Sequence, residues 1–165
     1  MFCAICCKRV FRFWPLRNET IYNELVKTKP QNAEYILADI SNDNCIKKIQ
    51  QTVGDRKLNL IVNNAGIQGE GMTLETATSK EILDLINVHC LGAFRVMKSI
   101  FTNFKESGSA VINVNSRLGS IHHQEIGTFK NMEVSYSYRI AKASQNMLTT
   151  SLQIEFPDIN FVSLT

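Results

Sequence analysis

The stretch LNLIVNNAG, residues 58–66, decides the fold class that we expect for this chain. Leu58 to Val62 is a short apolar run of the kind that forms a buried strand, and the glycine-rich segment Asn63 to Gly71 predicts a loop after it. From about Ser79 to Lys105, apolar residues recur at three- and four-residue spacing, which predicts a long helix. A buried strand, a loop and an amphipathic helix in this order form one β-α step of an α/β fold.

A second β-α step precedes this one. Ala33 to Ala38 predicts a strand. After it, Ser41 is suited to cap a helix from Asn42 to Val53, and Gly54 is placed to end that helix. Two successive steps of the same kind favour a sheet built by alternation of strands and helices.

The N-terminal residues fit the same alternation. Phe2 to Cys7 predicts a short buried strand, and Asn18 is suited to cap a helix that continues to Lys27. The residues before Asn18 are apolar and basic, so a targeting segment is the alternative, but they are not Ser-rich and the apolar stretch before Lys8 is short. A buried strand with a basic exit is the favoured interpretation.

Two more strands are expected toward the C-terminus. Ala110 to Val114 and Asn160 to Leu164 predict strands, separated by a long loop from Asn115 to Val134 and a helix from Ser135 to Glu155. Strands that are nearly continuous apolar runs predict a parallel sheet covered on both faces and connected by right-handed crossovers. We therefore expect a doubly wound α/β fold, with residues 1–165 forming a single Rossmann-like domain.

Composition excludes several classes of protein. The 165 residues are 44% apolar and 20% charged, and no apolar run reaches the roughly 18 residues that a membrane span needs. The net charge of +3 is small and the basic residues are scattered, so no nucleic-acid partner is expected. Five cysteines without a regular framework indicate a reducing compartment, and we expect a cytoplasmic protein. Cys3 and Cys6 have a zinc-site spacing, but no second Cys or His pair follows, so no metal is expected.

Doubly wound sheets bind ligands beyond the carboxyl ends of their strands. The sequence places four segments there: Cys7 to Arg9, Asp39 and Ile40, Asn63 to Gly66, and Asn115 and Ser116. Residues with catalytic or binding chemistry are therefore expected in these segments and close to them.

Tyr138 and Lys142 are four residues apart on the predicted C-terminal helix, so their side chains share one face. A phenol with an ordinary pKa of about 10 is a poor proton shuttle at neutral pH, but an adjacent ammonium group favours the phenolate. The pair is suited to acid–base chemistry, although a Tyr and a Lys at this spacing also arise by chance in a chain with four tyrosines.

The order of several motifs resembles the short-chain dehydrogenase/reductase family. Asn63-Asn64-Ala65-Gly66 follows the third expected strand, Ser116 follows the fourth, and Tyr138 begins the next helix. The similarity extends from about residue 33 to the C-terminus. The matching segments are ADI at 38–40, LIVNNAGI at 60–67, VINVNSRLGSI at 111–121 and YSYRIAKASQNMLTTSL at 136–152.

The resemblance implies a cofactor site for a nicotinamide dinucleotide. Asp39 would bond the adenine, while Asn63, Ala65 and Gly66 would stabilise the sheet and pass along the cofactor. The alternative for Asp39 is a solvated acid at a helix entry, and the alternative for Asn63 to Gly66 is a plain tight turn.

The resemblance also implies a mechanism. Ser116 would donate a hydrogen bond to the substrate carbonyl, Tyr138 would pass it a proton, and the nicotinamide would deliver a hydride to its carbon. Lys142 would assist Tyr138 and hold the nicotinamide ribose, so Tyr138 and Lys142 also count as cofactor-binding residues. The alternative for Ser116 is a turn former at the end of a strand.

One branch of the family matches better than the rest. The interval between Ser116 and Tyr138 is longer than is usual in the family, and it resembles the carbonyl-reductase-like branch, in which an inserted loop lies there. This implies a small carbonyl or alcohol substrate. His122 and His123 fall in that interval and are expected as exposed loop residues.

A helix Asn completes the catalytic set of the family, and here its position is ambiguous. In the usual pattern the Asn precedes a Gly by three residues, and counting back from Gly92 gives His89 rather than Asn87. Either the helix is irregular, as a π-type bulge would make it, or His89 fills the position. A buried, hydrogen-bonded core histidine is the favoured interpretation of His89.

The beginning of the chain departs from the family, which starts with a strand and a Thr-Gly-x-x-x-Gly-x-Gly turn that binds pyrophosphate. The segment Gly66 to Gly71 is not such a turn, because no helix starts directly after it. We expect the strand Phe2 to Cys7 to be the family's second strand, whose exit selects the cofactor. Lys8 and Arg9 at that exit favour NADP, with NAD as the alternative. The final strand and the substrate lid of the family are likewise expected to be missing after Thr165.

Three hypotheses follow. The first is an NADP-linked carbonyl reductase in fragment or shortened form. The second is a noncatalytic homologue that retains the two long helices, Ser79 to Lys105 and Ser135 to Glu155, as a dimerisation surface and pairs with a full-length relative. A homo-oligomer through the same two helices is also expected. The third is a truncated gene product without a function of its own.

Overall fold

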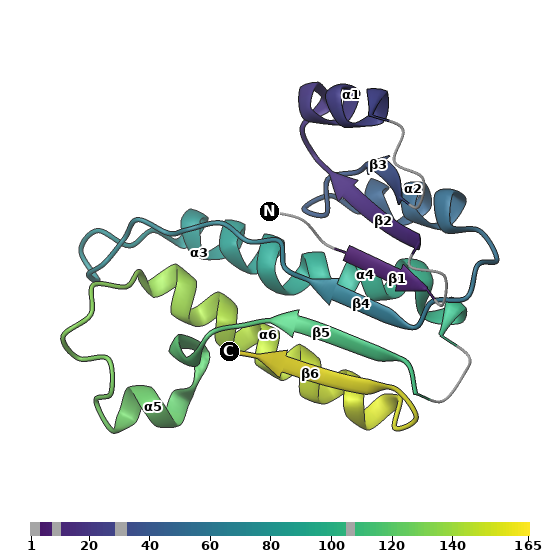
Figure 1. The fold of residues 1–165 in the computed structure, drawn as a ribbon. Helices are drawn as coiled ribbons and strands as arrows, with labels where there is room; N and C mark the ends of the chain where they lie inside the picture. Colours follow the sequence, from purple (N-terminus) through teal and green to yellow (C-terminus); the bar gives the residue numbers. More distant parts are fainter. Residues whose placement is uncertain (1–3, 8–10, 29–32, 105–107) are drawn as a thin grey trace.

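The computed structural model describes residues 4–7, 11–28, 33–104 and 108–165. Its centre is one six-stranded sheet with the strand order β3-β2-β1-β4-β5-β6 (Figure 1). The strands are β1 (Ala4–Cys7), β2 (Phe11–Leu16), β3 (Ala33–Leu37), β4 (Leu60–Asn63), β5 (Ala110–Val114) and β6 (Asn160–Leu164). The doubly wound α/β class is thus confirmed.

Strand β1 departs from the parallel arrangement. It pairs antiparallel with both β2 and β4, whereas the other pairs, β2 with β3, β4 with β5 and β5 with β6, are parallel. The sheet is therefore mixed. The central position is filled by a strand that runs opposite to its neighbours, and β2 is the next element of the described chain after it.

The prediction that Phe2 to Cys7 is the family's second strand is wrong. The strand that precedes β3 and pairs with it in parallel is β2, with Phe13 opposite Glu34 and Leu16 opposite Leu37. The residues at its carboxyl end are Arg17 and Asn18. Lys8 and Arg9 lie outside the described residues, as do Phe2 and Cys3.

The first two helices nearly match their predicted bounds. Helix α1 (Glu19–Lys27) is capped by Asn18, whose side chain accepts a hydrogen bond from the Ile21 N–H. Helix α2 (Asn44–Val53) ends at Gly54 as expected, with φ of 58°. The residue at its cap position is Asp43, which makes no side-chain cap bond, whereas Ser41 lies before it and donates its N–H and its hydroxyl to the Asp39 carboxylate.

The single long helix that was expected from Ser79 to Lys105 is interrupted. Helix α3 (Ser79–Ile86) passes into a π-helical turn, η1 (Asn87–Leu91), then α4 (Gly92–Ile100) and a 3₁₀ turn, η2 (Phe101–Asn103). A π turn adds one residue to the helical register, and such turns occur frequently at functional sites.

The region expected as a long loop after β5 contains local structure. A 3₁₀ turn, η3 (Arg117–Gly119), and a short helix, α5 (Ile121–Glu125), lie within it. His122 and His123 therefore sit on α5, where the first is exposed and the second half-buried, rather than in an irregular loop. The last helix is α6 (Tyr136–Glu155).

The core lies between the sheet and one layer of helices. Helix α2 packs beside α4, and α3 packs beside α6, so these helices form a row along one face (Figure 1). Ile61, Val111 and Phe161 point into this layer and are at most 8% exposed. Their neighbours in the strands face the other way, and of these Val162 is 43% exposed. Within the described residues, only one face of β4 to β6 is fully covered, whereas coverage of both faces was expected.

None of the helices that the structure describes is both long enough and apolar enough to cross a membrane.

Candidate active site

Two adjacent hollows lie at the carboxyl ends of the parallel strands. The first, which we call the Arg17 pocket, has a volume of about 280 Å³ and is lined by residues that follow β2, β3 and β4. The second, the Tyr138 pocket, has a volume of about 580 Å³ and is lined by residues that follow β4 and β5 and by α6. Gly66 and Ile67 line both. The two pockets therefore meet along the loop after β4.

The start of α6 positions the predicted catalytic pair. Ser135 caps the helix, and its Oγ accepts a hydrogen bond from the Tyr138 N–H at 3.3 Å. Tyr138 and Lys142 lie one turn apart and both line the Tyr138 pocket. The Lys142 Nζ lies 5.6 Å from the centroid of the Tyr138 ring, so the structure brings the two side chains together as expected.

Lys142 is buried, with 4% of its surface exposed. Its Nζ donates to the Val114 carbonyl at 2.8 Å and to the Gln145 Oε1 at 3.1 Å. Burial removes water from the ammonium group and lowers the pKa of Lys142 from 10.5 to about 8. At neutral pH the amine is still mostly protonated, but a larger fraction of it is neutral than in a lysine with the ordinary pKa of 10.5.

Tyr138 is half-buried, and its hydroxyl makes no hydrogen bond to any residue that the structure describes. The ring of His89 meets the Tyr138 ring edge-on, with 5.5 Å between centroids and an interplanar angle of 87°. The phenol oxygen is thus held on a fixed ring and remains open to a ligand.

Ser116 lies next to residues that line the Tyr138 pocket. Its Oγ accepts a hydrogen bond from the Leu118 N–H at 3.2 Å, which caps the η3 turn. Asn115 and Leu118 on either side of it line the Tyr138 pocket, but Ser116 is not itself among the lining residues. Within the described part of the chain, its hydroxyl proton is not donated to any acceptor.

A buried polar ladder fixes α6 against the sheet. The Asn63 Nδ2 donates to the Asn113 Oδ1 at 2.8 Å, and the Asn113 Nδ2 donates to the Thr149 Oγ1 at 2.8 Å. Asn63 and Asn113 are opposite each other in the β4–β5 register. Asn63 therefore has a structural contact of the sheet-stabilising kind that the resemblance implied. The sequence did not identify Asn113 and Thr149 as its partners.

The helix contains the π turn of the first alternative for the helix Asn, but it is His89, as in the second alternative, that lines the pocket. The π turn is present, but Asn87 faces away, and its Nδ2 donates to the Ser41 carbonyl at 3.0 Å. His89 is the residue that lines the Tyr138 pocket, and it is 2% exposed. Its Nε2 lies 2.9 Å from the Ile67 carbonyl oxygen, and burial lowers the pKa of His89 below its ordinary 6.5. Burial therefore favours the neutral form of the imidazole.

A carboxylate clamp that the sequence did not reveal holds the loop after β4. The Glu81 side chain accepts hydrogen bonds from the Glu70 N–H at 2.6 Å, the Gly71 N–H at 3.1 Å and the Ser137 Oγ at 2.6 Å. Thr78 and Glu81 have the spacing of a capping box. Thr78 does cap α3, but the Glu81 carboxylate reaches across to the loop instead of back to its own helix.

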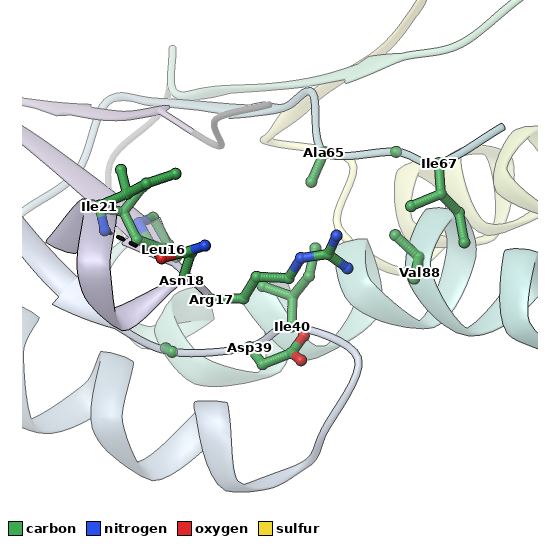
Figure 2. A pocket seen from close by; sticks show the side chains of 12 residues that line it. Leu16, Arg17, Asn18, Ile21, Asp39, Ile40, Ala65, Ile67 and Val88 are labelled. Carbon is green, nitrogen blue, oxygen red and sulfur yellow. Dashed lines mark hydrogen bonds between the residues drawn. The ribbon is translucent and has the colours of Figure 1, made fainter.

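The Arg17 pocket contains the predicted adenine-side residues. Asp39 and Ala65 both line it, and the Asp39 Oδ1 is occupied by the N–H and hydroxyl of Ser41. Figure 2 shows the Arg17 side chain reaching across the pocket from β2 toward the loop that carries Ala65, with Asp39 below it in the view. Arg17 is the basic residue at the exit of β2. Arg17 was not predicted from the sequence, because the exit of the family's second strand was expected at Lys8 and Arg9.

Metal chemistry has no candidate in the part of the chain that the structure describes, where no group of three His, Cys, Asp or Glu side chains converges.

The order of the strands and the helices that alternate with them define a Rossmann-like α/β fold. The chain belongs to the short-chain dehydrogenase family, whose model, described as short chain dehydrogenase, matches residues 15–163.

Individual relatives agree with this assignment. The chain is 30% identical over 138 residues to an uncharacterized oxidoreductase of Thermotoga maritima, covering 82% of this chain and 50% of that protein. It thus spans about half the length of this curated relative.

Solved structures show the same fold. An NADPH-bound carbonyl reductase from chicken fatty liver superposes with a TM-score of 0.73 at 24% identity, covering 88% of this chain and 62% of that one. The putative carbonyl reductase Sniffer of Caenorhabditis elegans gives 0.74 at 22% identity, with 92% and 70% covered.

Proposed function

We propose that this protein binds NADP(H) and catalyses hydride transfer between the nicotinamide and a small carbonyl or alcohol, with Tyr138 as the acid–base group. The observation that carries the proposal is the buried Lys142, whose Nζ lies 5.6 Å from the ring centroid of a tyrosine with an open hydroxyl. A buried ammonium beside a phenol on the wall of a pocket is an arrangement for proton transfer.

Tyr138, Lys142 and Ser116 have different roles in the proposed reaction. In the reductive direction, the Tyr138 hydroxyl gives its proton to the carbonyl oxygen of the substrate. The Lys142 ammonium stabilises the negative charge that the phenol oxygen gains, and it does so strongly because water is largely excluded around it. The Ser116 hydroxyl, whose proton has no acceptor among the described residues, donates to the same carbonyl oxygen and holds it in place.

The residues fit the two ends of a dinucleotide. Asp39 and Arg17 line one pocket, Tyr138 and Lys142 line the other, and the shared residues Gly66 and Ile67 join the pockets into one elongated surface. The described residues fit the middle less well, because β1 is succeeded by β2 and not by a helix whose N-terminus could face the phosphates. When bound, the nicotinamide supplies or accepts the hydride.

Arg17 supports the choice of NADP. A basic residue directly after the second strand of a dinucleotide-binding fold favours the 2′-phosphate of NADP, whereas an acidic residue there favours the free ribose hydroxyl of NAD. Arg17 is the basic residue that lines this pocket, and its guanidinium reaches into it (Figure 2).

The proposal is tested by NADPH oxidation with a panel of small aldehydes and ketones. Tyr138→Phe removes the proton donor and keeps the ring, so kcat should fall at least 100-fold while NADPH affinity stays within about threefold. Tyr136→Phe is the matched control, because Tyr136 lies two residues earlier on the same helix and does not line the pocket. Equal activity of Tyr138→Phe and the wild-type protein would contradict the mechanism.

We also propose that the protein forms a homo-oligomer through α3–α4 and α6. Large apolar side chains are exposed along both surfaces. On α6 they recur at seven-residue intervals, with Ile140 38%, Met147 68% and Ile154 78% exposed, and on α4 Phe94 is 42% exposed. Such a stripe on a helix supports packing against another helix. Sedimentation should show a dimer that Met147→Glu dissociates, and a monomeric wild-type protein at high concentration would exclude this arrangement.

A further inference from the structure

His89 has an unmet hydrogen-bonding requirement next to the proposed catalytic pair. Its Nε2 lies within bonding distance of Ile67, at 2.9 Å from the carbonyl oxygen and 3.2 Å from the N–H. Its Nδ1 is buried and has no hydrogen-bond partner among the residues that the structure describes. The ring cannot turn freely to find one, because it packs edge-on against Tyr138.

The unpaired Nδ1 needs a partner whichever tautomer is present. If Nε2 carries the proton and donates it to the Ile67 carbonyl, Nδ1 has a lone pair that requires a donor. If Nε2 accepts from the Ile67 N–H, Nδ1 carries the proton and requires an acceptor. A buried polar atom without a partner costs about 1–3 kcal/mol. Only a group that both donates and accepts satisfies both cases, and water is such a group.

A cavity of suitable size adjoins His89. It has a volume of about 10 Å³ and is lined by the polar side chains of Asn63, His89 and Gln145 together with apolar neighbours. A space of roughly 10–15 Å³ by this measure holds one water molecule if it offers two or more polar partners. Gln145 is 1% exposed, and its Oε1 is already bonded to the Lys142 Nζ at 3.1 Å.

We propose that one water molecule occupies this cavity, bonds His89 Nδ1 and the Gln145 amide, and thereby makes His89 and Gln145 positioning residues for Lys142. The link runs from His89 through the water to Gln145 and from its Oε1 to the Lys142 ammonium. With its amide nitrogen bonded to the water, Gln145 cannot flip and present that nitrogen to the ammonium. Lys142 then keeps an acceptor that favours its charged form.

This inference deepens the proposed function and rests on it for the catalytic role of the link. The hydrogen bonds from His89 through the water to Gln145 and Lys142 can be tested without measuring turnover. Lys142 faces three titratable groups that line the same pocket: Tyr138 on its own helix, His89 on η1 and Glu133 in the loop before α6. Its titration is read directly by NMR of ¹³C- and ¹⁵N-labelled lysine side chains, with Lys142→Met to assign the signal.

Two substitutions break the link from its two sides. His89→Phe removes Nδ1 and keeps a ring against Tyr138, and Gln145→Met removes the amide at nearly constant length. Each should lower the Lys142 pKa by about one unit from its wild-type value, because the ammonium loses an ordered acceptor. His122→Phe on α5 and Gln51→Met on α2 are the matched controls, and both should leave the titration unchanged. Should His89→Phe fail to fold, Gln145→Met alone answers the same question.

The water itself has a separate signature. In ¹⁵N-histidine spectra, Nδ1 of His89 should show the shift of a hydrogen-bonded nitrogen, an NOE to water, and a change of that shift in Gln145→Met. An unchanged Lys142 titration in both variants, or no response of His89 to Gln145→Met, would overturn the inference. If the NMR coupling is present but the wild-type protein does not oxidise NADPH with any carbonyl, the proposed function fails and this inference stands.

Discussion

The Glu81 carboxylate lies 2.6 Å from the Ser137 hydroxyl and so joins α3 to the first turn of α6, one residue before Tyr138. The Ser135 hydroxyl, which caps α6, lies 3.1 Å from the Ser137 hydroxyl, and the Tyr136 N–H donates to the Gly71 carbonyl. A side chain at Gly69 would collide with Glu81, Ser135 and Ser137. The loop after β4, the first turn of α6 and α3 are therefore held as one unit around the proposed proton donor.

Glu81→Gln should loosen this unit. Three donors converge on the carboxylate, and an amide would turn its own NH₂ group toward at least one of them. We expect kcat for NADPH oxidation to fall on the order of tenfold through misplacement of Tyr138, with a smaller change in KM. Glu75→Gln, at an exposed loop position, is the control and should keep wild-type kinetics.

The pH dependence of this effect has a definite sign. The bond from Ser137, and then those from Glu70 and Gly71, lower the pKa of Glu81 below its ordinary 4.5. A carboxyl whose pKa is lower in the folded state stabilises the fold above its unfolded-state value and loses that contribution as pH falls through its folded value. The stability difference between wild type and Glu81→Gln should thus be present at pH 7 and decline as the pH falls below the ordinary 4.5 in urea denaturation.

Arg17 should decide the choice between NADPH and NADH. Arg17→Gln removes the basic group of the pocket, so the Kd for NADPH should rise tenfold or more, about the contribution of one hydrogen bond to a charged group, while the Kd for NADH changes little. Isothermal calorimetry with both cofactors provides the measurement. Arg12→Gln, at the other end of β2, should alter neither affinity. Equal losses for the two cofactors would show that Arg17 does not read the 2′-phosphate.

The sequence predicted the parallel strands well, because a strand that is buried in the sheet requires apolar residues along most of its length. Leu60–Asn63 and Ala110–Val114 each alternate fully buried and partly buried residues, so their patterns carry the signal. Strand β2 gave no such signal, since FRFWPL interleaves Arg12 and Pro15 with its aromatic residues and follows a basic stretch. Missing β2 shifted the expected cofactor-selecting position from Arg17 to Lys8 and Arg9.

The direction of β1 depends on chain length rather than residue type. Only three residues separate Cys7 from Phe11, and a parallel crossover needs a dozen or more, so neighbouring strands joined this closely must be antiparallel. The edge-on contact between the rings of His89 and Tyr138 could not be predicted from the residue pattern either. It arises from the extra residue of the π turn at Asn87–Leu91, and whether that turn forms depends on tertiary packing.

Lys142 should leave a signature in the pH dependence of stability. Its pKa is about 8 in the folded protein and near the ordinary 10.5 when unfolded, because burial penalises the ammonium. The unfolded chain therefore binds more protons between these values, and stability contributed by this group rises with pH across that window. Relative to Lys142→Met, the wild-type protein should gain on the order of 1–3 kcal/mol between pH 7.5 and about 10.5 in urea denaturation. The raised pKa of Cys45 cancels in this comparison, since both proteins carry it.

Thr149 should contribute to stability through the buried polar ladder. Thr149→Val keeps the shape of the side chain but removes the oxygen that accepts from the Asn113 Nδ2, which leaves a buried donor unpaired. The free energy of unfolding should fall by about 1–3 kcal/mol. Thr150→Val changes the exposed neighbour on the same helix and should cost less than about 0.5 kcal/mol. Comparable losses in the two variants would argue against a special role for the ladder.

Gly66 is required by its contact with His89. A Cβ at Gly66 would lie 2.5 Å from the His89 Cε1, and the ring cannot retreat without giving up its contact with Ile67. Gly66→Ala should therefore lower the free energy of unfolding by about 1–3 kcal/mol, the usual cost of overpacking. His89→Ala removes the obstacle, so the double variant should recover part of that loss, with a coupling energy of about 0.5–3 kcal/mol in a double-mutant cycle.

Gly108→Ala separates this steric effect from backbone strain. A Cβ at Gly108 meets nothing within 4 Å, but its φ of 90° disfavours any other residue, so the substitution should destabilise the protein through conformation alone. His89→Ala should not relieve that loss. The outcome that would contradict this explanation is an equal response of both variants. If His89→Ala reduced the loss in free energy of unfolding equally in Gly66→Ala and Gly108→Ala, the close approach of Gly66 to His89 would not explain why the turn shared by the two pockets excludes a side chain.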